Sequence, residues 1–186
     1  MIYIVSGIAK AGKTYVARRI LQERRIAVFS TDYLMMSLSK ANPTIGVDHT
    51  DDDRDVARAL EPYLFAMIET MAENAVDQVI EGVHFLPAFA ARLIQAFPGK
   101  IRIVYLGYDS ADPNAKAAEL QLHAADVENA WFLAYSPAAM YKLVRYLIGE
   151  SERLKTEAEI YGLPYFDIVD IVRDVDKVLA CLFEKR

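Results

Sequence analysis

Residues 1–20 read MIYIVSGIAKAGKTYVARRI, which joins an apolar run, a turn with two glycines and an amphipathic stretch. The apolar run at 2–6 carries β-branched residues and is typical of a buried parallel strand. From 13 to 22, apolar residues recur at helical spacing while polar residues occupy the other side. A strand that passes through a tight turn into a helix indicates an α/β domain.

The turn from Gly7 to Thr14 has the pattern Gly-x4-Gly-Lys-Thr of the Walker A motif. Its glycines permit positive φ and let backbone N–H groups converge on phosphate oxygens, at the positive end of the next helix's dipole. We expect Lys13 to reach the β and γ phosphates of a nucleotide and the Thr14 hydroxyl to coordinate Mg²⁺. The alternative is a tight turn with an incidental lysine. Lys10 is expected to face solvent. The predicted nucleotide-binding residues are Gly7, Ala9, Lys10, Ala11, Gly12, Lys13, Thr14 and Tyr15.

The remaining chain alternates strands and helices. Further strands are predicted at 26–29, 78–81, 101–106 and 165–168, and further helices at 34–38, 51–71, 137–158 and after 170. Thr50 or Asp51 is the expected cap of the helix at 51–71, which Pro62 should kink or divide in two. Ser136 and Asp170 are the expected N-caps of the last two helices. The pattern predicts one three-layer α/β/α domain over 1–186, with a five-stranded parallel sheet and a ligand crevice at the carboxyl ends of its strands.

Composition narrows the class of protein. Lys and Arg number 21 against 26 Asp and Glu, and the resulting net charge of −5 weighs against nonspecific nucleic-acid binding. The uncharged stretches are too short to span a membrane, and because the sequence lacks a basic n-region with a cleavage site, we expect no signal peptide. Cys181 is the single cysteine, so we expect no internal disulfide and a cytoplasmic location. The sequence does not define an oligomeric state.

Two acidic residues are expected at the carboxyl edge of the sheet. The strand at 78–81 ends in Glu81, which could act through a water on Mg²⁺ or assist the acceptor, or simply cap a helix. Asp32 directly follows the second strand, where it could deprotonate or orient an attacking hydroxyl. The alternative is that Ser30, Thr31 or Asp32 only caps the helix at 34–38. The Asp-x-x-Gly and Asn-Lys-x-Asp motifs of GTPase switches are missing, as is an apolar strand ending in Asp or Asp-Glu, which a motor ATPase usually has.

Three stretches add a family resemblance to the Walker A motif: STDYL at 30–34, VIEGVHFLP at 79–87 and AEIYGLPYFDI at 158–168. Together they resemble the P-loop small-metabolite kinases, in particular the 2-phosphoglycerate kinases and adenylate-kinase-related kinases. The resemblance implies a P-loop NTPase core of five parallel strands, a helical substrate-binding insert at about 33–75 and a lid at about 108–140. It also implies that Asp32 handles the acceptor and that lid arginines neutralise the moving phosphoryl group.

The predicted lid departs from this pattern, because Lys116 is the one lysine or arginine between 109 and 139. The helix that follows carries Lys142, Arg145 and Arg153 in one stripe, from which we favour Arg145 as the cation that stabilises the transition state. A solvated charged face is the alternative.

An acidic acceptor would need cations, and Arg54 and Arg58 stand four residues apart on a predicted helix, with His84 just past the third strand. We expect these residues, with Asp32 and Glu81, to bind the substrate. Alternatively, the arginines pair with the aspartates at 51–53, and His84 satisfies a backbone carbonyl.

The sequence therefore predicts an ATP- and Mg²⁺-dependent phosphotransferase that acts on a hydroxyl of a small metabolite, with an anionic one favoured. One alternative is a kinase of an antibiotic, nucleotide or sugar-nucleotide target, similar to zeta-type toxins. Another is a slow nucleotide-binding regulatory ATPase.

Overall fold

A five-stranded parallel sheet forms the centre of the protein in a computed structural model that describes residues 1–122 and 131–184. The strands follow the order β2-β3-β1-β4-β5 across the sheet. Their bounds are β1 Ile2–Gly7, β2 Ala27–Ser30, β3 Gln78–Gly82, β4 Ile101–Gly107 and β5 Tyr165–Asp167. The predicted parallel α/β fold is confirmed, and β3 lies directly beside β1.

Seven α-helices and two short 3₁₀ turns connect or flank the strands in the described part of the chain. The helices are α1 Lys13–Arg24, α2 Thr31–Ala41, α3 Asp53–Glu73, α4 Pro87–Ala96, α5 Pro113–Leu122, α6 Pro137–Ile160 and α7 Ile171–Phe183. The 3₁₀ turns are η1 Pro43–Ile45 and η3 Trp131–Ala134. None of the described helices is long and apolar enough to cross a membrane.

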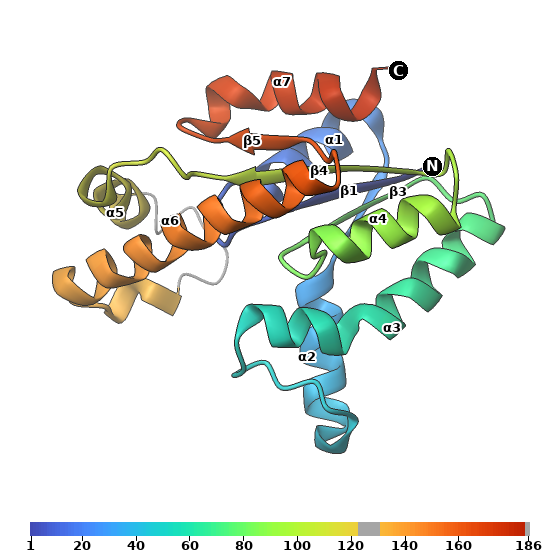
Figure 1. Cartoon of the computed structure of the whole chain (residues 1–186), viewed down its shortest axis with the longest axis horizontal. Coiled ribbons are helices and arrows are strands. Elements are labelled where there is room, and N and C mark those ends of the chain that lie inside the picture. The colour runs from blue at the N-terminus through green and yellow to red at the C-terminus, as the bar shows by residue number, and fades with distance from the viewer. Residues whose placement is uncertain (123–130, 185–186) are drawn as a thin grey trace.

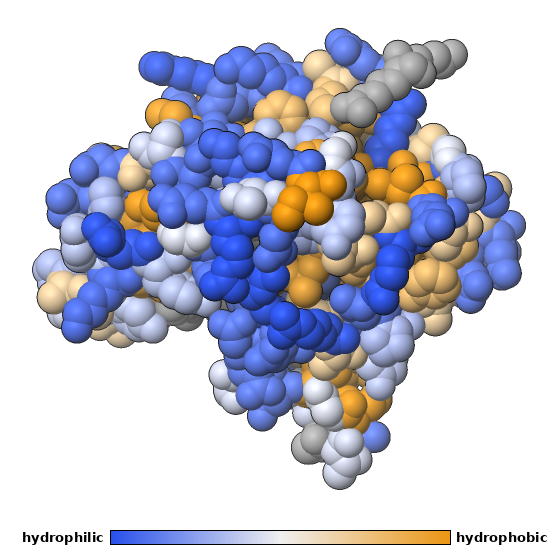
Figure 2. Space-filling model, viewed as in Figure 1, coloured by the Kyte–Doolittle hydropathy of each residue, from blue (hydrophilic) through white to orange (hydrophobic). Residues whose placement is uncertain are grey.

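Helices cover both faces of the sheet, so the expected three layers are present (Figure 1). Val16 of α1 and Val178 of α7 pack on one face, and Leu64 of α3 and Leu93 of α4 pack on the other. The long helix α6 contributes to both cores, because its first turns join the α1 and α7 side and its last turns the α3 and α4 side. The chain around α2 and η1 projects from this body, as Figures 1 and 2 show.

Several boundaries differ from the sequence prediction. Pro62 lies inside α3 without dividing it, because the packing of one face of α3 against the core extends on both sides of the proline. The N-cap of α3 is Asp52, whose side chain accepts a hydrogen bond from the Arg54 amide, so neither Thr50 nor Asp51 caps the helix. Helices α4 and α5 were not predicted, and α2 begins at Thr31. Ser136 and Asp170 cap α6 and α7 as predicted.

The register of the strands brings their carboxyl ends to one level. Ser6 lies opposite Gly82, Ser30 opposite Glu81, and Gly7 opposite Leu106. The residues that follow these positions therefore meet along one edge of the sheet, where an α/β protein of this kind binds its ligands.

Candidate active site

The Walker A turn lies between β1 and α1, and hydrogen bonds to Leu106 of β4 and to Tyr108 fix its conformation. The Ile8 amide donates to the Leu106 carbonyl at 2.9 Å, and the Tyr108 hydroxyl donates to the Ala9 carbonyl at 3.0 Å. Gly12, in the left-handed region with φ 88°, forms the N-cap of α1. Two strands of the sheet thus fix the loop, and the N-terminal amides of α1 point toward the place where a phosphate would lie.

The first glycine of the motif is required by close packing. Gly7 has φ 136°, and a Cβ at this position would overlap the backbone of Leu106 on the neighbouring strand. Both the backbone conformation and the missing side chain are therefore needed for the strand to turn into the loop.

Lys13 is buried within the loop. Its ammonium donates to the Ile8 carbonyl at 2.7 Å, which keeps it folded over the turn. Burial lowers the pKa of Lys13, while the carboxylates of Glu81, Asp32 and Asp53 oppose that shift. A desolvated ammonium is stabilised by an anion, so Lys13 suits a phosphate bound in the loop.

Thr14 and Glu81, the two predicted metal ligands, lie together. The Thr14 hydroxyl lies 3.4 Å from Oε2 of Glu81, which is itself buried at the end of β3. Among the described residues, no group of three or more His, Cys, Asp or Glu side chains gathers that could hold a metal. Mg²⁺ commonly uses one or two protein oxygens, with phosphates and waters completing its coordination, so the oxygens of Thr14 and Glu81 fit this ion.

Asp32 occupies the first turn of α2, with an exposed side chain at the carboxyl edge of the sheet. The N-cap of α2 is Ser30, and its side chain makes no capping hydrogen bond. Burial lowers the pKa values of Lys10, Lys13 and His84, and the carboxylate of Asp32 is near enough to oppose the shift of each. Asp32 is therefore not the helix cap, and it faces the phosphate loop.

His84 lies beneath Asp32 and is fully buried. Its Nδ1 lies 2.7 Å from the Thr31 hydroxyl, so its partner is a side chain rather than the backbone carbonyl considered above. Burial lowers the pKa of His84 to about 4, with Asp32 opposing the shift. A Cβ on Gly82, which has φ 155°, would overlap the Thr31 side chain. The Gly-x-His pattern after β3 thus supports the base of α2, and the neutral His84 contributes no positive charge to an acceptor site.

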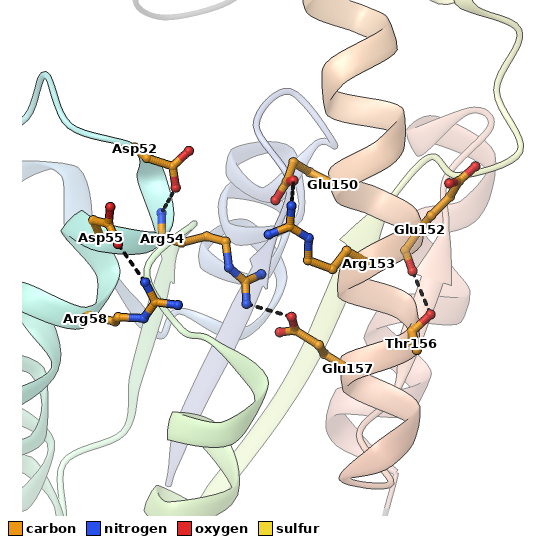
Figure 3. A network of polar contacts seen from close by, with 9 residues as sticks. All are labelled: Asp52, Arg54, Asp55, Arg58, Glu150, Glu152, Arg153, Thr156 and Glu157. Carbon is orange, nitrogen blue, oxygen red and sulfur yellow. Dashed lines mark hydrogen bonds and ion pairs between the residues drawn. The ribbon is translucent and has the colours of Figure 1, made fainter.

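Arg54 and Arg58 do not act together. The Arg54 guanidinium pairs with Glu157 of α6 at 2.6 Å, whereas Arg58 pairs with Asp55 at 2.6 Å on the exposed side of α3 (Figure 3). The expectation that both arginines point one way is wrong, because the side chain of Arg54 crosses to α6 and that of Arg58 turns back along α3. Arg58 instead borders a separate surface cleft with Glu61 and Arg92.

A small pocket of about 50 Å³ opens beside the phosphate loop, between the ends of β1 and β3 and helices α3 and α6. We call it the edge pocket. It is lined by Ser6, Gly7, Ile8, Ala9, Asp53, Arg54, Val83, Phe85, Leu86, Tyr146, Leu147, Glu150 and Leu154. The lining combines apolar side chains with a few polar and charged ones, as small-molecule sites do.

The remaining predicted cations are placed differently. Arg145 lies exposed on α6 and forms no ion pair with another described residue. Lys116 is buried over the ring of Tyr108, at 4.8 Å from its centroid, and pairs with Glu119, so it does not supply a mobile lid cation. Lys10, expected in solvent, is partly buried with its ammonium 5.2 Å from the ring centroid of Phe132. Part of the predicted lid, residues 123–130, lies outside the described residues.

Four residues of the site were not predicted from the sequence to be site residues. Ser6, Asp53, Tyr146 and Glu150 line the edge pocket from three different elements. Ser6 could have been noticed, because it directly precedes the phosphate loop on a buried strand. The other three come from helices whose approach to one another depends on the tertiary fold.

Similar folds occur among solved structures of kinases. A shikimate kinase from Bacteroides thetaiotaomicron matches with a TM-score of 0.58 at 13% identity, over 96% of each chain. A gluconokinase from Sinorhizobium meliloti 1021 matches with a TM-score of 0.58 at 18% identity, over 97% of this chain and 90% of that one. A sugar kinase from Janibacter sp. HTCC2649 gives 0.54 at 14% identity, over 97% and 93%. Neither the protein-family models nor the curated proteins give a match to this sequence. These similarities confirm the fold, and the resemblance to 2-phosphoglycerate kinases stays a prediction.

Proposed function

We propose that this protein is an ATP- and Mg²⁺-dependent phosphotransferase that moves the γ-phosphoryl group to a hydroxyl of a small acceptor. The observation that carries the proposal is the meeting of three elements at one edge of the sheet. Three groups converge beside the edge pocket: the Walker A loop with Lys13, the Thr14–Glu81 pair and the carboxylate of Asp32. Kinases of shikimate and other small molecules among the similar structures support this interpretation.

Each part of the loop has a distinct role in this proposal. The backbone amides from Ala9 to Thr14 bind the phosphate oxygens, and the Lys13 ammonium moves from the Ile8 carbonyl to the β and γ phosphates. Thr14 and Glu81 would hold Mg²⁺, which neutralises charge on the phosphates when bound. Together these groups stabilise the charge that spreads over the transferring phosphoryl group.

Asp32 acts on the acceptor. The acceptor oxygen forms a bond to the γ-phosphorus while the bond to the bridging oxygen breaks, and the nucleoside diphosphate leaves with the electron pair. Asp32 accepts the proton of the attacking hydroxyl and orients it in line. The edge pocket, which continues the phosphate loop on the α3 side, binds the rest of the acceptor.

The anionic, 2-phosphoglycerate-like acceptor favoured by the sequence is the finer form of this proposal. Its cations would be Arg54 and Arg58, with His84 beside them. The pairing of Arg54 with Glu157, the pairing of Arg58 with Asp55 and the neutral state of His84 argue against it. We therefore propose phosphoryl transfer to a hydroxyl without assigning a charge to the acceptor.

A product-resolved screen tests the function. The protein is incubated with ATP, Mg²⁺ and pooled small hydroxyl compounds, and mass spectrometry looks for one compound that gains a phosphoryl group. Asp32→Asn should lower its rate of formation by about 10²–10⁴-fold. Asp77→Asn is the matched control, because Asp77 precedes β3 at the opposite edge of the sheet and should leave the rate unchanged. ATP hydrolysis that no compound stimulates, with no phosphorylated product, would contradict the proposal and favour a regulatory ATPase.

A further inference from the structure

The positive charges at the edge pocket are already balanced by protein carboxylates. Arg54 is the one lysine or arginine among the residues that line the pocket, and its guanidinium binds Glu157 at 2.6 Å with both side chains largely buried. Arg153, on the next turn of α6, binds Glu150 at 2.6 Å (Figure 3). An anionic acceptor would have to break one of these ion pairs to find a cation in the pocket.

One carboxylate of the edge pocket, that of Asp53, is left without an ion pair among the described residues. Burial raises the pKa of Asp53, and the carboxylates of Asp52, Asp32 and Glu150 raise it further against the opposing effect of Lys13. In the phosphotransferase proposed above, Lys13 is engaged by the nucleotide. Asp53 then has no ion-pair partner on the described part of the protein, and a cationic group of a ligand can supply one.

Ser6 provides a second, independent indication of a ligand. Its hydroxyl is buried, with 1% of the residue exposed, and has no hydrogen-bond partner among the described residues. Ile2 and Ile4 of β1 pack on the α3 and α4 side of the sheet and Val5 on the other, so strand alternation directs Ser6 to the side of the edge pocket. A buried hydroxyl without a partner costs stability unless a ligand satisfies it.

From these observations we propose that the edge pocket binds an acceptor with a protonated amine close to the hydroxyl that receives the phosphoryl group. The amine binds Asp53, the carboxylate of the pocket that forms no ion pair with another described residue, and a hydroxyl of the same molecule pairs with Ser6. The small volume of the pocket favours a compact compound, an amino alcohol or a single amino sugar. This inference rests on the proposed function, because it names the class of acceptor for that site.

Three pools of hydroxyl compounds, matched in size and different in charge, test the inference. The first holds amino alcohols and amino sugars from ethanolamine to glucosamine, the second neutral polyols and sugars from ethylene glycol to glucose, and the third hydroxy acids from glycolate to gluconate. Phosphoryl transfer from ATP is followed by mass. We expect kcat/KM for the best amine to exceed that for its neutral counterpart by about tenfold or more, as a charge-assisted hydrogen bond would give.

The outcomes separate this inference from the proposed function. Preference for the neutral or acidic pool would overturn the inference and leave the phosphotransferase standing. Transfer to none of the pools, by protein that still binds ATP, would contradict both.

Variants of the pocket give a second measurement. Asp53→Asn should raise KM for the amine about tenfold or more and leave KM for the neutral counterpart nearly unchanged. Ser6→Ala should weaken the binding of both, without loss of thermal stability, because it removes an unsatisfied group. Asp55→Asn is the matched control, since Asp55 lies two residues along α3 and pairs with Arg58 outside the pocket. If Asp53→Asn changed only the Mg²⁺ requirement, Asp53 would be a metal ligand and the inference would be wrong.

Discussion

The Thr14 hydroxyl lies 3.4 Å from Glu81 Oε2, although 67 residues separate them along the chain. Parallel pairing of β1 with β3, in a register that sets Ser6 against Gly82, brings the two side chains to the same level at the edge of the sheet. Each residue was predicted separately as a metal ligand. Their contact brings the end of the phosphate loop next to the end of β3. The pair gives the first test of the site.

Glu81→Gln keeps the size of the side chain and removes its charge. If Glu81 supports Mg²⁺, the concentration of Mg²⁺ needed for half-maximal activity should rise by about 10–100-fold. Binding of ATP in the absence of metal should change little. Glu73→Gln, at the exposed end of α3, is the control. A Mg²⁺ titration indistinguishable from that of the wild type would assign Glu81 to a structural role.

Arg145 is exposed on α6 and directly precedes Tyr146, the first residue of that helix that lines the edge pocket. If it neutralises the transferring phosphoryl group, Arg145→Ala should lower kcat by about 10³-fold or more with a small change in KM. Lys142→Ala, on the same helix and also exposed, serves as the comparison. An unchanged kcat in steady-state kinetics would place Arg145 on the solvated face.

Two glycines should respond in opposite directions to alanine. Gly82→Ala places a Cβ against the Thr31 side chain and should reduce the free energy of unfolding by about 1–3 kcal/mol. Gly149 lies exposed within α6, and a Cβ at this position would meet no other atom within 4 Å, so Gly149→Ala should raise the free energy of unfolding by about 0.5–1 kcal/mol. Urea unfolding of both variants measures the difference. Equal effects would mean that Gly82 is not required by packing.

His84 should make stability depend on pH. Its pKa is lowered to about 4 in the folded protein from an ordinary value of 6.5, so between these values the unfolded chain binds more protons. The free energy of unfolding should therefore fall as the pH falls from 6.5 toward 4, by a His84 contribution on the order of 2 kcal/mol, and this contribution should be fully present above pH 6.5. Urea unfolding across this range, compared with His84→Asn, measures it. Parallel pH profiles for the two proteins would contradict the prediction.

The sequence was sufficient for the strands and for the phosphate loop because both depend on local patterns. Ile4 and Val5 mark a buried strand, and the glycines of the loop occur where the backbone needs them. The N-caps Ser136 and Asp170 were likewise readable from residue type and position. Helix α4 was missed although its pattern is visible in retrospect, with Pro87 at the first position and Phe89 and Leu93 four residues apart on its buried face.

The edge pocket could not be predicted, because its lining depends on how α3 and α6 cross. Arg54 of α3 forms an ion pair with Glu157 of α6, which is 103 residues away along the chain. The Tyr146 hydroxyl of α6 donates a hydrogen bond to Asp52, the N-cap of α3, at 3.1 Å. Helical spacing placed Arg54 and Arg58 on one side of α3 but could not reveal the carboxylates that would meet them. For the same reason Asp53, considered in the sequence as a partner of the nearby arginines, became a candidate ligand once its surroundings were known.

The proposed function requires that the loop ahead of Lys13 bind the phosphates of a nucleoside triphosphate. Isothermal titration calorimetry of the folded protein with ATP and GTP, in the presence of Mg²⁺, measures this binding. We expect saturable binding at a single site per chain, weakened by about tenfold or more in Lys13→Ala, because the variant loses charged hydrogen bonds to phosphate. No detectable binding of either nucleotide by the folded wild-type protein would contradict the proposed function.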